Sequence, residues 1–231
     1  KKIRASHQAA FPVLLKPCRD PAEQNKYLTA QLRDYHAQGY AYEQMAILFR
    51  TNLGIRFVMD ALMKGGIPFH MKDAIPNLFA HWISLDIIAY LRLVSGTGNT
   101  RANWLRIMNR PNRYIKREAL APFTSDISVA QLKAYYQDKD WMLERLDRLE
   151  YDLSIMKRMS PYAAIHYLSN AMKYQDYLKD YAKEHHINEQ ELLDVLNAVH
   201  ESSQSCRTFA EWFTYIDTYT EELQKQAKSP A

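Results

Sequence analysis

The spacing of apolar residues changes once along the chain. In the first part, short continuous apolar runs at residues 11–16, 45–49 and 67–71 alternate with helical spacing at residues 21–39 and 53–64. Continuous runs of this length are typical of buried parallel strands, and helical spacing is typical of the helices that pack on them. The order strand, helix, strand, helix, strand predicts a partial parallel α/β layer.

The later part carries helical spacing with few residues that interrupt helices. All six glycines lie between Gly39 and Gly98, and Pro161 is the only proline between Phe123 and Ser229. We therefore expect this part to be nearly all helix. Helices are predicted over residues 82–94, 101–109, 128–137, 141–159, 161–173, 175–184, 189–203 and 208–226.

The two patterns together predict a mixed, mainly α fold, with a partial parallel α/β layer followed by an all-α helical subdomain. We place the α/β part at residues 1–71 and the helical subdomain at residues 72–207. Residues 208–231 are expected to form a helix that returns toward the first part.

Composition excludes several protein classes. Hydrophobic residues make up 47% of the chain and charged residues 24%, which argues against disorder. The longest apolar stretch, residues 87–94, is too short to cross a membrane, and no signal-peptide pattern is visible. Cys18 and Cys206 lie far apart without a C-x-x-C motif, so neither a disulfide scaffold nor a zinc site is predicted. We therefore expect a cytoplasmic protein without a metal site or a membrane partner.

Charge is unevenly distributed. Residues 101–117 contain six basic residues and no acidic one, whereas residues 184–222 contain nine acidic residues and one basic residue. This polarity favours a phosphate-facing surface on one side and a solvated or protein-facing surface on the other. Alternatively, the charged residues of both stretches are scattered over several helix faces and form no common surface.

Candidate catalytic chemistry is sparse. No glycine is followed by Lys-Ser or Lys-Thr, so the phosphate-binding loop of nucleotide hydrolases is missing from the sequence. His185 and His186 have no partner at metal-ligand spacing, and no nucleophile–base set is visible. The aromatic residues at 135–136 and 212–219 have helical spacing, which favours core packing over base stacking. We expect no catalytic residue and no cofactor in this chain.

Four short motifs occur in order between residues 50 and 115. They are Arg50-Thr51-Asn52, Gly66-Ile67-Pro68-Phe69, Asp86-Ile87-Ile88-Ala89-Tyr90-Leu91-Arg92-Leu93 and Asn109-Arg110-Pro111-Asn112-Arg113-Tyr114-Ile115. At these motifs the chain resembles the UvrD/Rep/PcrA group of superfamily 1A DNA helicases. The resemblance covers part of the second RecA-like motor lobe, called 2A, and the helical 2B subdomain that is inserted in it.

The resemblance implies that the parent protein is an ATP-dependent DNA helicase that uses ATP and Mg²⁺. This chain would contribute single-strand contacts and a regulatory helical subdomain that contacts duplex DNA, with a single-strand–duplex junction as its partner. Arg50, Thr51 and Asn52 would contact single-stranded DNA at the carboxyl end of a parallel strand. Alternatively, Asn52 caps the following helix and Arg50 pairs with a carboxylate.

The chain departs from the family pattern where Gly-Ile-Gly normally approaches duplex DNA, since Tyr114, Ile115 and Lys116 stand there. Without glycine a close approach of the backbone to a phosphate is harder, so the side chains of Lys116 and Arg117 are expected to substitute for it. Arg110 and Arg113 are further candidates for phosphate contacts in the same basic run. As an alternative, Arg113 is structural and bonds the carbonyl groups at a helix end.

A second interpretation is a non-catalytic protein-interaction module derived from a helicase 2B subdomain. In that case the acidic stretch at residues 184–222 binds a protein partner. The altered Gly-Ile-Gly position favours this module, whereas the clustered basic run favours DNA.

Overall fold

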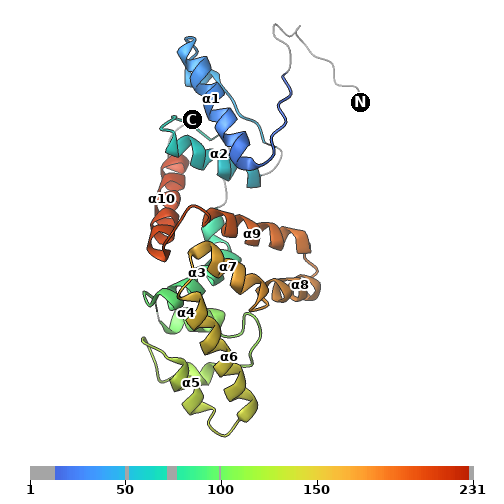
Figure 1. The fold of residues 1–231 in the computed structure, drawn as a ribbon, viewed down its shortest axis with the longest axis vertical. Helices are drawn as coiled ribbons and strands as arrows, with labels where there is room; N and C mark the ends of the chain where they lie inside the picture. Colours follow the sequence, from blue (N-terminus) through green and yellow to red (C-terminus); the bar gives the residue numbers. More distant parts are fainter. Residues whose placement is uncertain (1–13, 50–51, 72–76, 99, 229–231) are drawn as a thin grey trace. The chain divides into compact units, whose positions relative to one another are not determined.

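The computed structural model describes residues 14–49, 52–71, 77–98 and 100–228. The chain divides into two compact units, Lys1–Lys72 and Asp73–Ala231, which we call the first unit and the helical unit. Figure 1 shows that regular structure in both units consists of helices. No β-strand is present among the described residues, so the expected parallel α/β layer is not seen there.

The first unit contains α1 (Pro21–Ala37), the 3₁₀ turn η1 (Tyr42–Gln44) and α2 (Asn52–Lys64). The carboxylate of Asp20 starts α1 by accepting a hydrogen bond from the Glu23 amide at 2.8 Å. A small apolar cluster is built on three buried residues, Val58, Leu62 and Ile67. The partly buried residues that pack against it are Leu28, Leu32, Tyr42, Ile47, Phe49 and Phe69.

The apolar runs that were expected to form strands take irregular backbone without ladder hydrogen bonds where they are described, at residues 14–16, 45–49 and 67–71. Side chains still alternate in the middle run, since Ile47 and Phe49 pack on the cluster while Leu48 is 93% exposed. A strand needs a neighbouring strand to satisfy its backbone groups, and local sequence cannot supply one. The prediction of these three strands is therefore not supported by the described residues.

The helical unit confirms the prediction of an all-helical later part, with helix ends shifted by a few residues. Its elements are η2 (Leu78–Ala80), α3 (Trp82–Ser95), α4 (Arg101–Ile107), η3 (Arg117–Leu120), α5 (Val129–Tyr135), α6 (Asp140–Met156), α7 (Pro161–Asn170), α8 (Tyr174–His185), α9 (Glu189–Ser202) and α10 (Phe209–Lys228). None of the helices in the described part of the chain is long and apolar enough to span a membrane.

Local side-chain chemistry explains several of the helix ends. Ser128 and Ser160 start α5 and α7 because each hydroxyl accepts a hydrogen bond from a backbone amide three residues later. Pro161 occupies the first position of α7, where its missing amide hydrogen costs no helical hydrogen bond. Gly96 ends α3 in the left-handed region with φ 75°.

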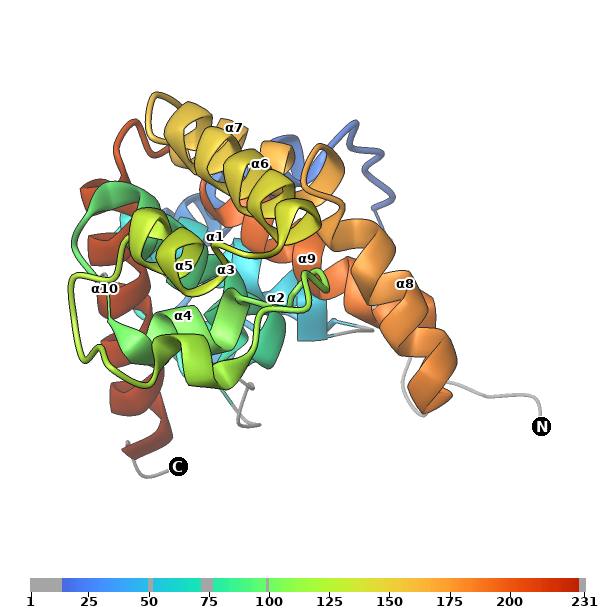
Figure 2. The ribbon, with the colours of Figure 1, turned by 90° about the horizontal axis from the view of Figure 1, so that it is seen from below.

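Helix α3 is the centre of the helical unit, and α4, α6, α7 and α9 pack against it (Figure 2). Its residues Ile83, Ile87, Tyr90 and Leu91 are fully buried. Apolar residues on all sides of α3 suit this position, because a helix surrounded by neighbours has no solvent-facing stripe. Helix α3 therefore provides the core on which α4 and the residues that follow α4 are positioned.

Candidate nucleic-acid interface

The predicted single-strand motif can be placed only in part. Arg50 and Thr51 lie outside the described residues, and Asn52 is described only as the first residue of α2. Their contact with single-stranded DNA therefore stays a prediction. The rest of the candidate interface is the basic turn, which we define as residues 109–117 between α4 and η3.

The side-chain amide of Asn109 organises the basic turn. Its Oδ1 atom accepts hydrogen bonds from the backbone amides of Arg113 at 3.2 Å and Ile115 at 2.9 Å, while its Nδ2 atom donates to the Ile115 carbonyl at 2.9 Å. Asparagine suits this role because its short amide replaces the backbone partners that a turn lacks. Buried Ile115 anchors the turn to the core.

Arg113 bonds the end of helix α4. Its Nη1 atom donates to the carbonyl oxygens of Ile107 and Pro111, each at 3.1 Å. Its guanidinium carbon also lies 5.8 Å from the ring centroid of buried Tyr90. These contacts match the structural alternative for Arg113, because a guanidinium at a helix end satisfies carbonyls that have no helical partner.

Arg110 and Arg106 share one buried carboxylate, that of Asp86. The Nη1 atom of Arg110 lies 2.8 Å from Asp86 Oδ1, and the Nη1 atom of Arg106 lies 3.2 Å from the same oxygen. The hydroxyl of Tyr174 in α8 donates to Asp86 Oδ2 at 2.9 Å. Asp86 is fully buried, whereas 37% of the Arg110 side chain is exposed. This cluster joins α3, α4, α8 and the basic turn.

Opposing effects act on the pKa of Asp86. Burial raises the pKa of Asp86, and the charge of Arg110 together with the hydrogen bonds from Arg110, Tyr174 and Arg106 opposes that increase. Two guanidinium groups on one carboxylate leave the cluster with excess positive charge at the protein surface. Arg110 therefore holds the fold together while part of its side chain stays accessible.

Lys116 and Arg117 have exposed side chains on a fixed backbone. The Lys116 amide donates to the hydroxyl of buried Tyr136 at 2.6 Å, and Arg117 begins η3 directly afterwards. The main chain is thus held while both cations project into solvent. Of the four predicted phosphate contacts in the turn, these two are the most accessible.

Tyr114 of the basic turn and two residues of α6, Trp141 and Arg145, lie together and were not predicted as part of the site. The guanidinium carbon of Arg145 lies 4.9 Å from the ring centroid of Tyr114 and 5.3 Å from that of Trp141. Both rings are exposed. Trp141 and Arg145 are four residues apart and therefore lie on one face of α6. This spacing could have identified the pair from the sequence. Nothing in the sequence pattern indicates that Tyr114 joins them.

Three of the six aromatic residues that were predicted to pack in the core are buried, and Phe213 and Tyr215 are half-buried. Tyr136, Trp212 and Tyr219 are buried, whereas Tyr135 is about half exposed. His185 and His186 lie in solvent at the carboxyl end of α8. Within the described ranges, no group of three or more His, Cys, Asp or Glu side chains is arranged to hold a metal ion.

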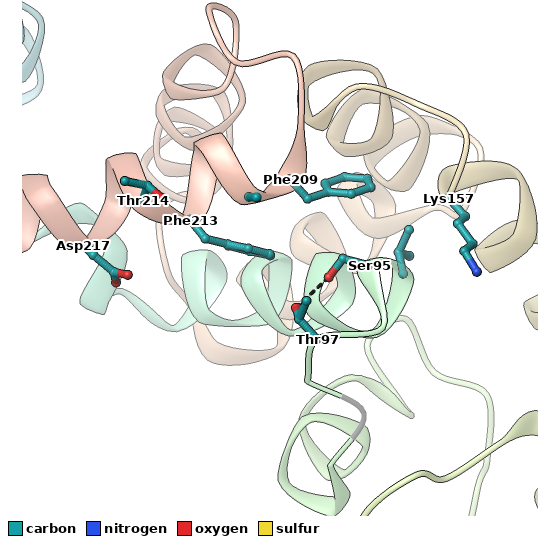
Figure 3. A pocket seen from close by; sticks show the side chains of 9 residues that line it. Ser95, Thr97, Lys157, Phe209, Phe213, Thr214 and Asp217 are labelled. Carbon is teal, nitrogen blue, oxygen red and sulfur yellow. Dashed lines mark hydrogen bonds between the residues drawn. The ribbon is translucent and has the colours of Figure 1, made fainter.

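A separate open cavity of about 550 Å³ lies between the ends of α3, α6 and α10 (Figure 3). Its lining residues are Val94, Ser95, Thr97, Lys157, Phe209, Ala210, Phe213, Thr214 and Asp217. Figure 3 shows Phe213 between α10 and α3, with Lys157 and Asp217 toward opposite ends of the hollow. The hydroxyls of Ser95 and Thr97 hydrogen-bond each other at 2.8 Å. This lining offers packing surface rather than a nucleophile with a base.

The acidic stretch lies on α9 and α10, where its carboxylates are largely in solvent. Glu191, Glu201, Glu211, Asp217 and Glu221 are all exposed. Glu211 also accepts a hydrogen bond from the Arg207 amide at 2.7 Å at the start of α10. The stretch is therefore a largely solvated helix surface whose contacts are local, such as those of Asp194 with Gln190 and of Glu222 with Lys225.

Comparison with known proteins gives consistent matches. Residues 1–229 match the family of the UvrD-like helicase C-terminal domain. The chain is 25% identical over 174 residues to the putative ATP-dependent DNA helicase YjcD of Bacillus subtilis, covering 73% of this chain and 22% of that protein. It is 26% identical over 164 residues to the ATP-dependent DNA helicase PcrA of Staphylococcus epidermidis, covering 70% and 20%. With the ATP-dependent DNA helicase Rep of Buchnera aphidicola it shares 30% identity over 98 residues, covering 42% and 15%. The chain spans about a fifth of the length of the first two relatives.

Proposed function

Because the chain belongs to the family of UvrD-like helicase C-terminal domains, we propose that it is part of an ATP-dependent DNA helicase whose helical unit contacts DNA. Relatives that are named as ATP-dependent DNA helicases support this proposal. The sequence of this chain contains no phosphate-binding loop, so ATP and Mg²⁺ would bind to other parts of the parent protein. The role of this chain would be to hold and sense DNA rather than to hydrolyse nucleotide.

The observation that carries the proposal is that the basic residues between 101 and 117 have two different roles. Arg106, Arg110 and Arg113 are engaged with Asp86 or with carbonyl groups, so they fix the turn. Lys116 and Arg117 extend from the fixed turn into solvent. Two exposed cations on a backbone that hydrogen bonds hold, in the same turn as the partly exposed Arg110, suit the phosphates of duplex DNA.

For the first unit we propose a place in a RecA-like layer of the parent protein. Residues 45–49 alternate between packed and exposed side chains, as a strand does, and Leu48 is almost fully exposed. A neighbouring strand from elsewhere in the parent protein would satisfy the backbone of this segment and cover Leu48. Arg50, Thr51 and Asn52 would then follow a strand end and contact single-stranded DNA.

A direct test replaces the two exposed cations in the variant Lys116→Ala/Arg117→Ala and measures binding to a DNA hairpin over a range of salt concentrations. Each lost phosphate contact should reduce the slope of log affinity against log salt by about 0.9, because fewer counterions are released on binding. Arg110 is left unchanged, since its loss would also disturb the Asp86 cluster.

The matched control is Lys139→Ala/Lys157→Ala, which removes two exposed lysines from the two ends of α6. Its salt slope should equal that of the parent chain. If the two double variants behave alike, the basic turn is not the DNA surface. The exposed carboxylates of α9 and α10 would then favour the second candidate function, a protein-interaction module.

A further inference from the structure

We propose that Tyr114, Arg145 and Trp141 form a stacking surface for unpaired DNA bases next to the phosphate-binding turn. We call these three residues the aromatic stack. The inference rests on the proposed function and deepens it, because it specifies that the helical unit recognises bases at a single-strand–duplex junction in addition to duplex phosphates.

The first argument is the arrangement of the three side chains. The guanidinium carbon of Arg145 lies 4.9 Å from the Tyr114 ring and 5.3 Å from the Trp141 ring, so one cation contacts two aromatic rings. The two residues that carry the rings are 59% and 50% exposed. The fold therefore presents ring surface to solvent instead of burying it, although burial of an aromatic ring is strongly favourable.

The backbone at Tyr114 provides the second argument. Its φ of 60° lies in the left-handed region, which bulky residues rarely adopt unless the surroundings impose it. Here the surroundings do so, since the Tyr114 amide donates to Asn112 Oδ1 at 3.0 Å and Asn109 bonds the residues on either side. Glycine would take this conformation without strain. A tyrosine that is held there with its ring in solvent indicates a use for the ring.

Base recognition fits the neighbourhood better than a purely ionic contact. Lys116 lies two residues beyond Tyr114, so phosphate-binding and stacking groups are adjacent along the same turn. Within the aromatic stack the single cation, Arg145, already lies over both rings. Affinity at the aromatic stack should therefore come from ring contacts, which depend little on salt, whereas the contacts of Lys116 and Arg117 depend strongly on it.

Unpaired bases are the matching ligand because base pairs inside a duplex already have both faces covered by their neighbours. An aromatic ring or guanidinium plane accepts any unpaired base, since every base has a flat face. The aromatic stack should therefore favour DNA in which a few unpaired bases follow directly on a duplex.

The test uses the full chain and two DNA hairpins that both carry a short single-stranded extension. In one hairpin the extension is oligothymidine, and in the other the thymine bases are replaced by abasic sites, so the phosphates are unchanged. We expect tighter binding of the thymidine extension by about 5- to 100-fold, the range typical of stacking on one base. The salt slopes of the two hairpins should be equal.

Three variants separate stacking from folding. Tyr114→Gly and Trp141→Ala should each reduce the preference for thymine at least several-fold and leave the salt slope unchanged. Because glycine suits a φ of 60°, Tyr114→Gly should keep the turn folded, which its melting temperature verifies. The control Tyr151→Ala removes an exposed tyrosine that also lies beside an arginine of α6, with 5.7 Å between the guanidinium carbon of Arg148 and the ring, and it should keep the full preference.

Equal affinity of the parent chain for the two extensions overturns the aromatic stack as a base-binding surface and leaves it as a surface for a protein partner. The proposed function survives that outcome if Lys116→Ala/Arg117→Ala still flattens the salt slope. If the parent chain binds neither hairpin, both proposals fail. An unchanged preference in Tyr114→Gly and Trp141→Ala places the base contact elsewhere and also overturns the inference.

Discussion

Exposed apolar side chains differ in kind between the two units. Among the described residues of the first unit, the three most exposed large apolar residues are aliphatic, since Leu14, Leu15 and Leu48 are 75%, 91% and 93% exposed. In the helical unit the most exposed large residues are aromatic, and Tyr114, Trp141 and Tyr151 each lie beside an arginine. Exposed leucines indicate a surface that a neighbouring segment covers, whereas the exposed rings of Tyr114 and Trp141, which share Arg145, form the proposed base-binding surface.

The hydrophobic core of the first unit is smaller than that of the helical unit. The first unit is built around a cluster of three buried residues, Val58, Leu62 and Ile67, with partly buried neighbours. The helical unit has a central helix with fully buried residues and a buried ionic cluster at Asp86. Since stability follows buried apolar area and satisfied polar groups, the helical unit should dominate the unfolding of the chain.

The largest expected effect is at the Asp86 cluster. Replacing Asp86 by alanine leaves Arg106 and Arg110 without their shared carboxylate and removes the acceptor of the Tyr174 hydroxyl. Loss of one partner from a buried ion pair typically lowers the free energy of unfolding by about 3–5 kcal/mol, and the partial exposure of both arginines favours the lower end. Urea denaturation followed by circular dichroism measures the change.

Asp180→Ala is the matched control, because this exposed carboxylate of α8 lies 4.0 Å from Lys183. Its loss should change the free energy of unfolding by less than about 0.5 kcal/mol. If both substitutions have similarly small effects, the Asp86 cluster does not organise the helical unit.

A second comparison replaces one core leucine by alanine in each of the two units. Leu132 of α5 is fully buried, and Leu132→Ala should lower the free energy of the main unfolding transition by about 2–5 kcal/mol through lost contacts and a cavity. Leu62→Ala affects the cluster of the first unit and should leave that transition within about 0.5 kcal/mol of the parent. Similar shifts for the two variants would show that the units unfold as one.

Sequence pattern located the helices well because helical hydrogen bonds join residues four apart, so the information is local. The prediction of residues 82–94 as a central helix, for example, matches Trp82–Ser95 of α3. The expected strands at residues 45–49 and 67–71 depended on neighbours that no local pattern specifies. The same apolar residues therefore predicted burial correctly for Ile47 and Ile67 but not a sheet.

The basic turn was located from sequence, but the partners of its residues were not. Asp86 was part of a motif, yet its contact with Tyr174 joins positions 88 residues apart. Such pairs follow from how helices pack, which the sequence of one chain does not specify. Arg113 is the exception, because bonding to helix-end carbonyls is a local alternative that the sequence allowed.

The smallest expected effect is a pH dependence within the helical unit. Burial lowers the pKa of His200 on α9, and nearby His166 lowers it further, although the Tyr162 carbonyl opposes them. The folded state therefore favours neutral His200, so this stabilisation is present above the unfolded pKa of 6.5 and is lost as pH falls below it. Urea denaturation from about pH 7.5 to pH 5.5 should show a smaller decrease for His200→Gln than for the parent. An identical pH profile in the variant would contradict this role.

Amide hydrogen exchange of the intact 231-residue chain tests the difference between the two units most directly. Amides in the middle of α3 should exchange only when the helical unit unfolds, because they lie in its core. Amides at residues 46–49 and 69–71 should show little protection, since no strand pairs with these segments in the described structure. Comparable protection of those segments and of α3 would contradict the account, because it would show that the first unit is as completely folded as the helical unit.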